Sequence, residues 1–198
     1  MATKKIEGSA RERLLAAANE LFYAEGIHTV GIDRVIAHAG VAKASLYSTF
    51  GSKEELVRAY LQARADARHG RIEARIAALT DPREQILAIF DVQAEIVSAP
   101  NWRGCPFVNA SAEGARESRV AEVCAGSRTW LRDLFARLAE AAGADDPDRL
   151  ARRLVMLYDG AAVAAGMDRT LEASADARAM AEAQLPAPGG KKQARVQG

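Results

Sequence analysis

Aromatic residues, cysteines and long apolar runs are all scarce in this chain of 198 residues. Its two cysteines, Cys105 and Cys124, are too few for a disulfide framework, and they lack the spacing of metal ligands. No window approaches the roughly eighteen consecutive apolar residues of a membrane helix, and the N-terminus has no apolar signal core. We therefore expect a cytoplasmic protein that has no membrane partner and binds no metal or cofactor.

The motifs of the common enzyme classes are missing as well. His28, His38 and His69 are the only histidines, and no H-E-x-x-H, Gly-x-Ser-x-Gly, P-loop or dinucleotide-binding glycine pattern occurs. Carboxylates are numerous, but they are scattered along helical faces where Glu and Arg alternate, which is typical of solvated surface. The sequence therefore predicts that the protein is not an enzyme.

Alanine is abundant, and apolar residues recur at helical spacing. Hydrophobic residues make up 49% of the chain, and no β-branched runs alternate with polar residues, so the predicted fold class is all-α. Ser9 with Glu12, and Ser52 with Glu55, have the spacing of capping boxes. Such signals divide the chain into about nine helices. Their expected ranges are 9–25, 32–39, 43–49, 52–78, 82–99, one within 100–114, 117–142, 147–166 and 171–184.

The segment 26–53, GIHTVGIDRVIAHAGVAKASLYSTFGSK, is the most informative part of the sequence. It contains two short helical patterns, and Gly40 between them allows the left-handed turn at a helix C-terminus. Two helices joined by a glycine turn make a helix-turn-helix. Between Arg34 and Lys53 there is no Asp or Glu, which suits a surface that meets phosphates. Net charge gives no such indication, because 27 Lys and Arg stand against 26 Asp and Glu.

The run AGVAKASLYSTFGSKEEL, residues 39–56, resembles the signature of the TetR family of transcriptional repressors. That signature has Ala-Gly-Val, a short polar stretch, an aliphatic-Tyr-x-x-Phe step and Ser-Lys-x-x-Leu. The resemblance implies a DNA-binding transcriptional regulator, and specifically a ligand-responsive repressor that binds a pseudo-palindromic operator as a homodimer. The matching residues are Ala39, Gly40, Val41, Leu46, Tyr47, Phe50, Ser52, Lys53 and Leu56.

The resemblance also implies a division of the chain into domains. We expect a helix-turn-helix DNA-binding domain at residues 1–51 and a helical ligand-binding and dimerisation domain at 52–185. Residues 186–198 are rich in Pro and Gly, basic and free of acid, so we expect a disordered tail there.

Eight side chains are the predicted contacts with double-stranded operator DNA. The first residues of a recognition helix reach base edges, and hydroxyl and ammonium groups bind phosphate oxygens. Lys53 begins the following helix, whose N-terminal amides also favour phosphate. The predicted DNA-binding residues are Thr29, Lys43, Ala44, Ser45, Tyr47, Ser48, Thr49 and Lys53.

The start of the second helix departs from the family pattern. The family usually has Thr or Ser there, which caps the helix and touches phosphate, whereas this chain has Val30-Gly31. Glycine is also an acceptable cap, so the expected fold does not change. We expect His28 or Thr29 to supply the phosphate contact instead.

Dimerisation is implied by the resemblance and placed on the eighth and ninth helices. An apolar stripe at helical spacing offers a surface for pairing two copies, which would put two recognition helices about 34 Å apart. The alternative is that this stripe packs inside its own chain. The predicted interface residues are Leu150, Leu154, Leu157, Ala161 and Ala165.

A small-molecule effector is expected from the resemblance, and its identity is not predicted. The segment at 104–109 resembles a Gly-Cys-Pro-Phe-x-Asn motif found in one branch of TetR-like regulators. Aromatic side chains with a few polar groups are typical of a pocket, but they are equally typical of a helical core, and Asn109 also suits a helix cap. Cys105 is either a redox-sensitive thiol or a buried, inert one. The candidate ligand-binding residues are Phe90, Trp102, Arg103, Cys105, Phe107, Asn109, Trp130 and Tyr158.

Two other functions stay open on the sequence alone. One is a helical protein-interaction module that does not bind DNA, and the other is a helical enzyme without a recognisable motif. Acidic residues on the third helix would favour the interaction module, and none occur there. A salt-dependent shift of promoter DNA distinguishes the regulator from both alternatives.

Overall fold

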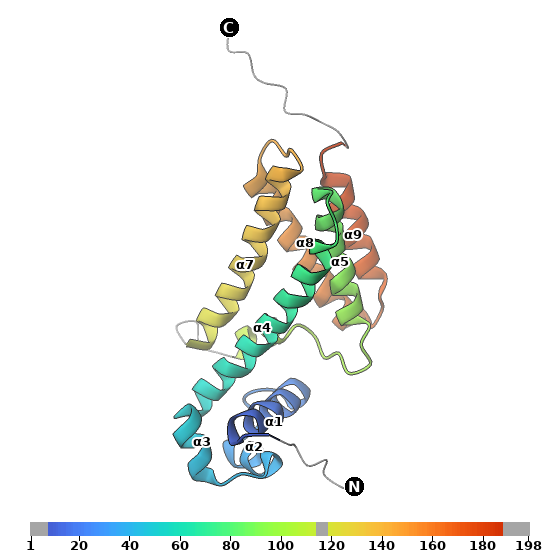
Figure 1. The fold of residues 1–198 in the computed structure, drawn as a ribbon. Coiled ribbons are helices and arrows are strands. Elements are labelled where there is room, and N and C mark those ends of the chain that lie inside the picture. Colours follow the sequence, from blue (N-terminus) through green and yellow to red (C-terminus); the bar gives the residue numbers. More distant parts are fainter. Residues whose placement is uncertain (1–7, 114–118, 188–198) are drawn as a thin grey trace. The chain divides into compact units, whose positions relative to one another are not determined.

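The computed structural model describes residues 8–113 and 119–187, and every regular element within these ranges is an α-helix. The predicted all-α fold class is thereby confirmed. None of these helices is both long and apolar enough to cross a bilayer. Figure 1 shows the helices of the described ranges, which are α1 (Ala10–Glu25), α2 (Ile32–Ala39), α3 (Lys43–Phe50), α4 (Lys53–Ala77), α5 (Pro82–Val97), α6 (Pro106–Glu113), α7 (Arg119–Ala141), α8 (Pro147–Asp168) and α9 (Glu172–Gln184).

Side-chain caps determine where several helices begin. The Ser9 hydroxyl accepts the N–H of Glu12 at 3.3 Å, and the Glu12 carboxylate accepts the N–H of Ser9 at 2.8 Å, which is the predicted capping box. Asp81 and Asp146 cap α5 and α8, and each is followed by proline at the first helical position. Because these signals are local, the helix boundaries lie close to those expected from the sequence.

Two local predictions are wrong. Ser52 accepts the N–H of Glu55 at 3.2 Å, but the Glu55 carboxylate binds Arg58 at 2.8 Å and Arg119 at 2.7 Å instead of completing a second capping box. These two arginines lower the pKa of Glu55. Asn109 does not cap α6, because the helix begins at Pro106 and Asn109 lies inside it.

The described residues form two compact units. The first unit contains residues up to 67 together with 105–127, and the second contains 68–104 together with the residues from 128 onward. The first unit is larger than the head expected at 1–51, because α6 and the beginnings of α4 and α7 belong to it. Of the tail expected at 186–198, residues 188–198 lie outside the described ranges.

Small aliphatic side chains dominate the core of the first unit. Leu14 of α1, Val35 of α2 and Leu46 of α3 are fully buried against one another's helices. Phe107 and Ala110 of α6 are buried in the same cluster. The three-helix head is therefore not a separate core, because α4 and α6 supply part of the apolar surface that covers it.

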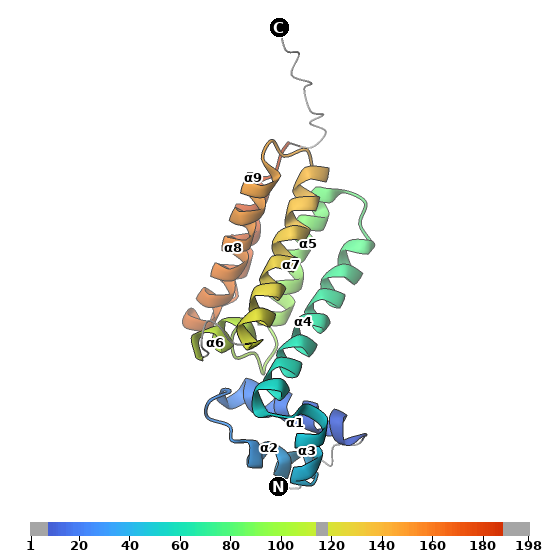
Figure 2. The same cartoon turned by 90° about the vertical axis from the view of Figure 1, so that its left-hand side faces the viewer.

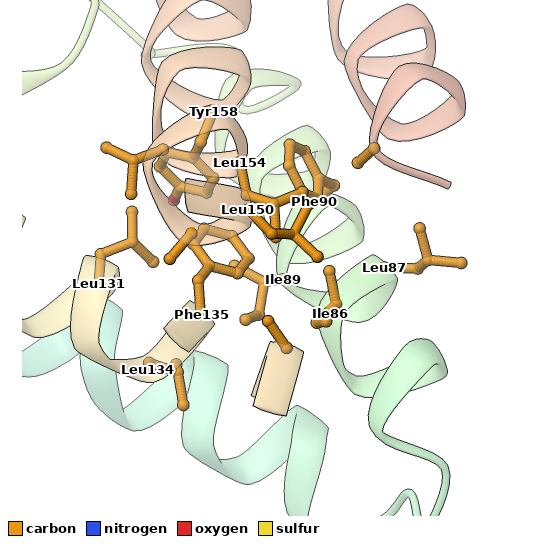
Figure 3. Packing of buried hydrophobic residues seen from close by; sticks show 14 of the residues in the cluster. Ile86, Leu87, Ile89, Phe90, Leu131, Leu134, Phe135, Leu150, Leu154 and Tyr158 are labelled. Atoms are coloured by element: carbon orange, nitrogen blue, oxygen red, sulfur yellow. The ribbon is translucent and has the colours of Figure 1, made fainter. Parts of the chain in front are cut away.

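The core of the second unit contains three aromatic rings among aliphatic side chains. Helices α5, α8 and α9 run side by side in Figures 1 and 2 and contact one another pairwise. Figure 3 shows the rings of this core, where the ring centroid of Phe90 on α5 lies 5.8 Å from that of Phe135 on α7 and 6.0 Å from that of Tyr158 on α8. Edge-on and tilted ring pairs at this spacing contribute about 0.5–1.5 kcal/mol each beyond their burial.

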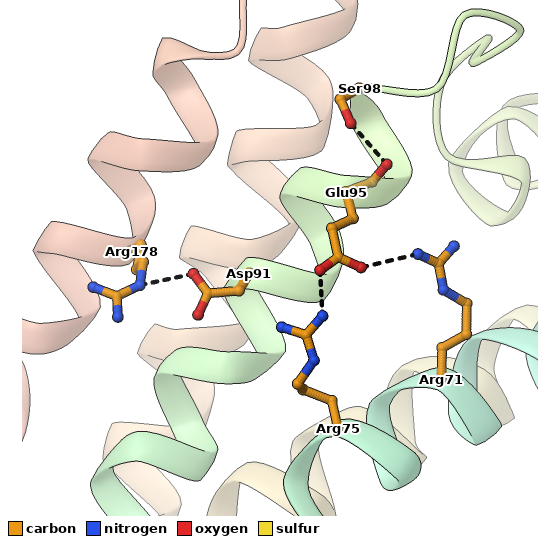
Figure 4. A network of polar contacts seen from close by, with 6 residues as sticks. All are labelled: Arg71, Arg75, Asp91, Glu95, Ser98 and Arg178. Carbon is orange, nitrogen blue, oxygen red and sulfur yellow. Dashed lines mark hydrogen bonds and ion pairs between the residues drawn. The ribbon is translucent and has the colours of Figure 1, made fainter.

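Ion pairs link the helices of the second unit outside this core. Figure 4 shows Glu95 of α5 between Arg71 and Arg75 of α4, with the Arg71 contact at 3.2 Å. Asp91, one turn earlier on α5, binds Arg178 of α9 at 2.8 Å. Through its acidic face α5 is thus joined to two neighbouring helices of its own unit.

Four of the five residues predicted as the dimer interface are buried inside the second unit, so their side chains are not open to a second copy, whereas the assignment of Leu157 stays a prediction. α5 and α9 contact α8, and the alternative of packing within the chain holds. Leu157 is half-buried against this core. Another face of α8 is exposed, with Met156 at 68% and Met167 at 78% of their accessible surface. The buried members of the stripe are Leu150, Leu154, Ala161 and Ala165.

Candidate nucleic-acid interface

Helices α2 and α3 form the helix-turn-helix that the sequence predicted. Gly31 is the N-cap of α2, and because glycine has no side chain, no side-chain hydrogen bond caps this helix. Gly40 ends α2 in the left-handed conformation, with φ 62° and ψ 41°, where a side chain would be strained. Arg13 of α1 donates to the carbonyl of Gly40 at 3.1 Å. The turn is therefore held by both its own backbone and the preceding helix.

One face of α3 is exposed, and most of the predicted DNA contacts lie on it. Leu46 is fully buried and anchors the helix, whereas the Tyr47 side chain is 48% exposed. Ser45 is half-buried, and Thr29 is exposed in the turn before α2. The exposed residues of α3 are Lys43, Ala44, Tyr47, Ser48 and Thr49.

The two hydroxyls at the end of α3 are bound to the helix itself. Ser48 donates to the carbonyl of Ser45 at 3.2 Å, and Thr49 donates to the same carbonyl at 2.6 Å. Such bonds to a preceding turn are common for Ser and Thr in helices. Each oxygen still has lone pairs, but donation to a phosphate requires the hydroxyl to rotate away from the backbone.

The cations described in and next to the head all contact groups of the protein itself. Five Lys and Arg side chains lie between residues 8 and 53 of the described chain, and each contacts a partner. Arg11 lies 5.7 Å over the Phe50 ring, Arg13 binds the Gly40 carbonyl, Arg34 pairs with Glu25, Lys43 pairs with Asp33, and Lys53 binds the Ile27 carbonyl.

The position of Asp33 contradicts the expectation that the surface around α3 is free of carboxylates. It precedes the segment without carboxylates in sequence, yet its Oδ1 lies 2.9 Å from the ammonium of Lys43, the first residue of α3. This carboxylate raises the pKa of Lys43, through the hydrogen bond first and the opposite charge second. Sequence reasoning missed the pair because ten residues and a turn separate its members.

Lys53 is a predicted phosphate contact, but its ammonium group already binds a backbone carbonyl of the protein itself. Its ammonium donates to the carbonyl of Ile27 at 2.6 Å and lies 5.9 Å from the centroid of the Phe22 ring. The side chain is partly buried, so it stabilises the connection between α1 and α2. The ammonium has three donors, and those not used by Ile27 remain for another acceptor.

Glu113 is a residue of this unit that sequence reasoning did not single out. Its carboxylate accepts the N–H of His28 at 2.9 Å, and its backbone carbonyl contacts Nε2 of the same histidine. The turn at 26–28 is therefore held by Lys53 of α4 and by Glu113 of α6. No local sequence signal indicates this contact, because 85 residues separate its partners.

The candidate ligand-binding residues do not form one cluster. In the second unit, Phe90 and Tyr158 are core residues, and Trp130 stacks on His69 with the ring centroids 3.7 Å apart. Trp102 is half-buried, and a Cβ added at Gly166 would lie 3.4 Å from its ring. Arg103 is exposed. The alternative that the candidate aromatic residues belong to a helical core therefore applies to Phe90 and Tyr158.

The remaining candidates belong to the first unit. Phe107 is buried in its apolar core, Cys105 is half-buried beside that core, and Asn109 is exposed on α6. Cys124 is buried, and burial raises the pKa of its thiol, which disfavours the reactive thiolate. No three His, Cys, Asp or Glu side chains of the described ranges are grouped as metal ligands would be.

Gln93 is a polar residue in the core of the second unit. It is 2% exposed, and its amide donates to the carbonyl of Tyr158 at 2.5 Å. Its Oε1 has no hydrogen-bond partner among the described residues. The sequence signal was a glutamine at a position where the helical spacing of Ile86, Ile89 and Phe90 calls for an apolar side chain.

Known transcriptional regulators align with this chain. An uncharacterized regulator of Mycobacterium tuberculosis is 31% identical over 175 residues, which cover 86% of this chain and 81% of that protein. The activator FasR of Mycolicibacterium smegmatis is 38% identical over 78 residues, 39% of this chain and 36% of FasR. LmrA of Bacillus subtilis is 30% identical over 120 residues, 59% of this chain and 64% of LmrA. The chain therefore spans less than two thirds of FasR and of LmrA.

A solved structure and a family description agree with these alignments. The crystal structure of SCO4454, a TetR-family transcriptional regulator from Streptomyces coelicolor, matches with a TM-score of 0.83 and 36% identity, over 88% of this chain and 87% of that chain. Residues 14–60 match the family described as bacterial regulatory proteins, tetR family. These residues include α2, α3 and the start of α4. The chain belongs to the TetR family of transcriptional regulators.

Proposed function

We propose that this protein is a homodimeric repressor that binds a pseudo-palindromic operator through α3 and releases it in response to a small molecule. The observation that carries the proposal is the exposed face of α3, where Lys43, Ala44 and Tyr47 stand at the start of a helix anchored by buried Leu46. The first turns of a recognition helix supply its base contacts. Repression needs only occupancy of the promoter, whereas activation, the role named for FasR, also needs a surface that contacts polymerase.

Protection mapping of the purified protein on its own upstream DNA tests this function. We expect a protected segment with two half-sites about one helical turn apart, and binding that weakens as salt rises. Tyr47→Ala and Lys53→Ala should each weaken binding while the protein remains a dimer. Parent-like affinity in both variants would show that the assigned contact surface is wrong, and binding of no duplex at all would remove the DNA-binding proposal.

The same proposal assigns DNA reading to residues 1–51, and ligand binding and pairing to 52–185. Dimerisation through an exposed apolar face of α8 and α9 replaces the stripe predicted from the sequence. Met156, Gly160, Val163 and Met167 follow one another at helical spacing on α8, and Met180 is exposed on α9. Apolar side chains in a row with a small residue among them allow two copies of the helix to approach closely.

An effector site in the second unit is proposed around Gln93. Its buried Oε1 lacks a partner, and Phe90 lies three residues earlier on the same helix. An apolar ligand with one hydrogen-bond donor suits such surroundings. Screening compounds of this kind for release of the protected DNA tests the site. Gln93→Met should abolish the response without changing operator affinity, whereas an unchanged response would exclude Gln93.

The loop at 104–109 is proposed to mark a branch of the family. Gly104 has φ 94°, which favours glycine, and Pro106 is the first residue of α6, where proline is preferred. The Gly-Cys-Pro-Phe-x-Asn pattern therefore has a physical role in starting α6. Cys105 and Asn109 of this loop, and Trp102 and Arg103 before it, are partly or fully exposed, and each remains a candidate for effector contact.

A further inference from the structure

The ion pair between Asp33 and Lys43 lies where the protein is proposed to read DNA. Lys43 is the first residue of α3 and the only cation of that helix. Asp33 is in the first turn of α2, and its Oδ1 lies 2.9 Å from the Lys43 ammonium. Both side chains are open to solvent, at 59% for Lys43 and 77% for Asp33. A carboxylate thus stands beside the side chain best placed to meet DNA.

This position is unfavourable for binding to phosphate. A free lysine that meets a phosphate releases about 0.9 of a counterion, which gives non-specific DNA binding its strength and salt dependence. With Asp33 at hydrogen-bond distance the pair has no net charge, and the carboxylate repels an approaching phosphate. A base edge is different, because guanine O6 and N7 are neutral acceptors. An ammonium has three donors, so Lys43 can bind a base edge while one donor remains on Asp33.

We propose that Asp33 is a positioning residue that stays paired with Lys43 on the operator, aims its ammonium at a base edge and keeps it from the phosphates of other DNA. The inference rests on the proposed DNA-binding function and adds a residue outside the eight predicted contacts. Asp33 is held in place by its helix, because Val35 and Ile36 of α2 are buried. The carboxylate therefore limits the directions that the flexible Lys43 side chain can take.

Asp33→Asn tests the proposal, since it keeps the shape and removes the charge. Affinity is measured by fluorescence anisotropy at several salt concentrations, on the duplex identified by protection mapping and on a scrambled duplex of equal length. We expect non-operator affinity to rise about fivefold for each bound head at roughly 0.15 M salt, the contribution of one added phosphate contact. Operator affinity should stay level or fall, so the ratio of the two affinities decreases.

Further variants separate Asp33 from general charge effects. Asp33→Glu should restore most of the ratio, because a carboxylate remains within reach of Lys43. Asp33→Asn combined with Lys43→Met should lose the gain on non-operator DNA. Glu20→Gln is the matched control, since it removes a carboxylate paired with His38 at 2.8 Å on the same head. It should behave as the parent does.

Two outcomes would overturn the inference. If Asp33→Asn raises operator and non-operator affinity equally, Asp33 is a simple competitor for Lys43 and does not aim it. If the gain persists without Lys43, Asp33 acts by direct repulsion of DNA. The failure of the proposed function has a different signature, because the parent itself would then bind neither duplex in a salt-dependent manner.

Discussion

The two units of the protein differ in what they leave exposed. In the first unit the five cations described between residues 8 and 53 each contact a group of the protein itself. Tyr47 and Val108 are the exposed large hydrophobic side chains of this unit in the described ranges. In the second unit five such side chains are exposed, all between residues 156 and 180. They are Met156, Val163, Met167, Leu171 and Met180.

This difference indicates two kinds of partner. A polar helix face with one aromatic ring suits a nucleic acid, where hydrogen bonds and charge dominate. A row of methionines and a valine suits another apolar surface, because contiguous exposed apolar side chains mark protein contacts. The cores do not differ in this way, since the first contains Phe22, Tyr60 and Phe107 and the second Phe90, Phe135 and Tyr158. The predictions below test whether each exposed surface has the partner assigned to it.

The largest effect is expected from breaking the apolar surface of the second unit. Val163→Glu with Met167→Glu should convert the dimer to monomers, because charges would be buried where two copies meet. Operator affinity should fall by about 10²–10⁴, the advantage that linking two binding modules gives. Light scattering and anisotropy measure the two quantities. Val108→Glu, an equally apolar exposed site of the first unit, is the control, and a dimeric double variant would refute the assigned surface.

A large effect is also expected from each core. Leu46 of α3 and Leu154 of α8 are both fully buried, and truncating either to alanine should lower the free energy of unfolding by about 2–5 kcal/mol. Denaturant unfolding measures the loss, and amide exchange shows where it falls. Leu46→Ala should lower exchange protection in α1–α3 and reduce operator affinity, while Leu154→Ala should act on α5, α8 and α9. If each variant loses exchange protection equally in all of these helices, the two units do not unfold separately.

A moderate effect distinguishes the two lysines of the head. Lys53→Met should lower the free energy of unfolding by about 1.5 kcal/mol, because it removes a charged hydrogen bond to the Ile27 carbonyl. Lys43→Met should leave stability unchanged and reduce operator affinity, since its partner Asp33 is exposed and remains solvated. Thermal unfolding and operator titration measure both variants. Equal stability of the two would contradict the structural role of Lys53.

The smallest effect concerns the pH dependence of the second unit. Arg75, and then Arg71, hold the pKa of Glu95 below its usual range, so the pair stabilises the fold above the ordinary glutamate pKa of about 4.3. That stabilisation is lost as the pH falls through the lowered value. Because Glu95 is half exposed, Glu95→Gln should cost no more than about 1 kcal/mol at neutral pH. The free energy of unfolding of Glu95→Gln should also fall less steeply in acid than that of the parent. Parallel curves of this free energy against pH for the two proteins would contradict the prediction.

Much of the fold could be predicted from the sequence because its signals are local. Ser9, Asp81 and Asp146 begin helices where their side chains accept backbone N–H groups, and Gly40 ends one where a left-handed residue is needed. The TetR signature is local as well, and it predicted the helix-turn-helix that α2 and α3 form. The ligand site stays a prediction, because aromatic residues serve a pocket and a core equally well. Phe90, Phe107 and Tyr158 proved to be buried core residues.

What the sequence by itself determined is where most of the helices begin and end, and which family the chain resembles. Only the tertiary structure decided which side of a helix faces inward and which charges meet. Helix α8 has apolar residues on more than one side, and contact with α5 and α9 buried Leu154 while leaving Met167 exposed. Asp33 and Lys43 became partners because a turn brings the ends of two helices together. The physical reason is that helical period and capping act within a few residues, whereas burial and ion pairing depend on neighbours distant in the chain.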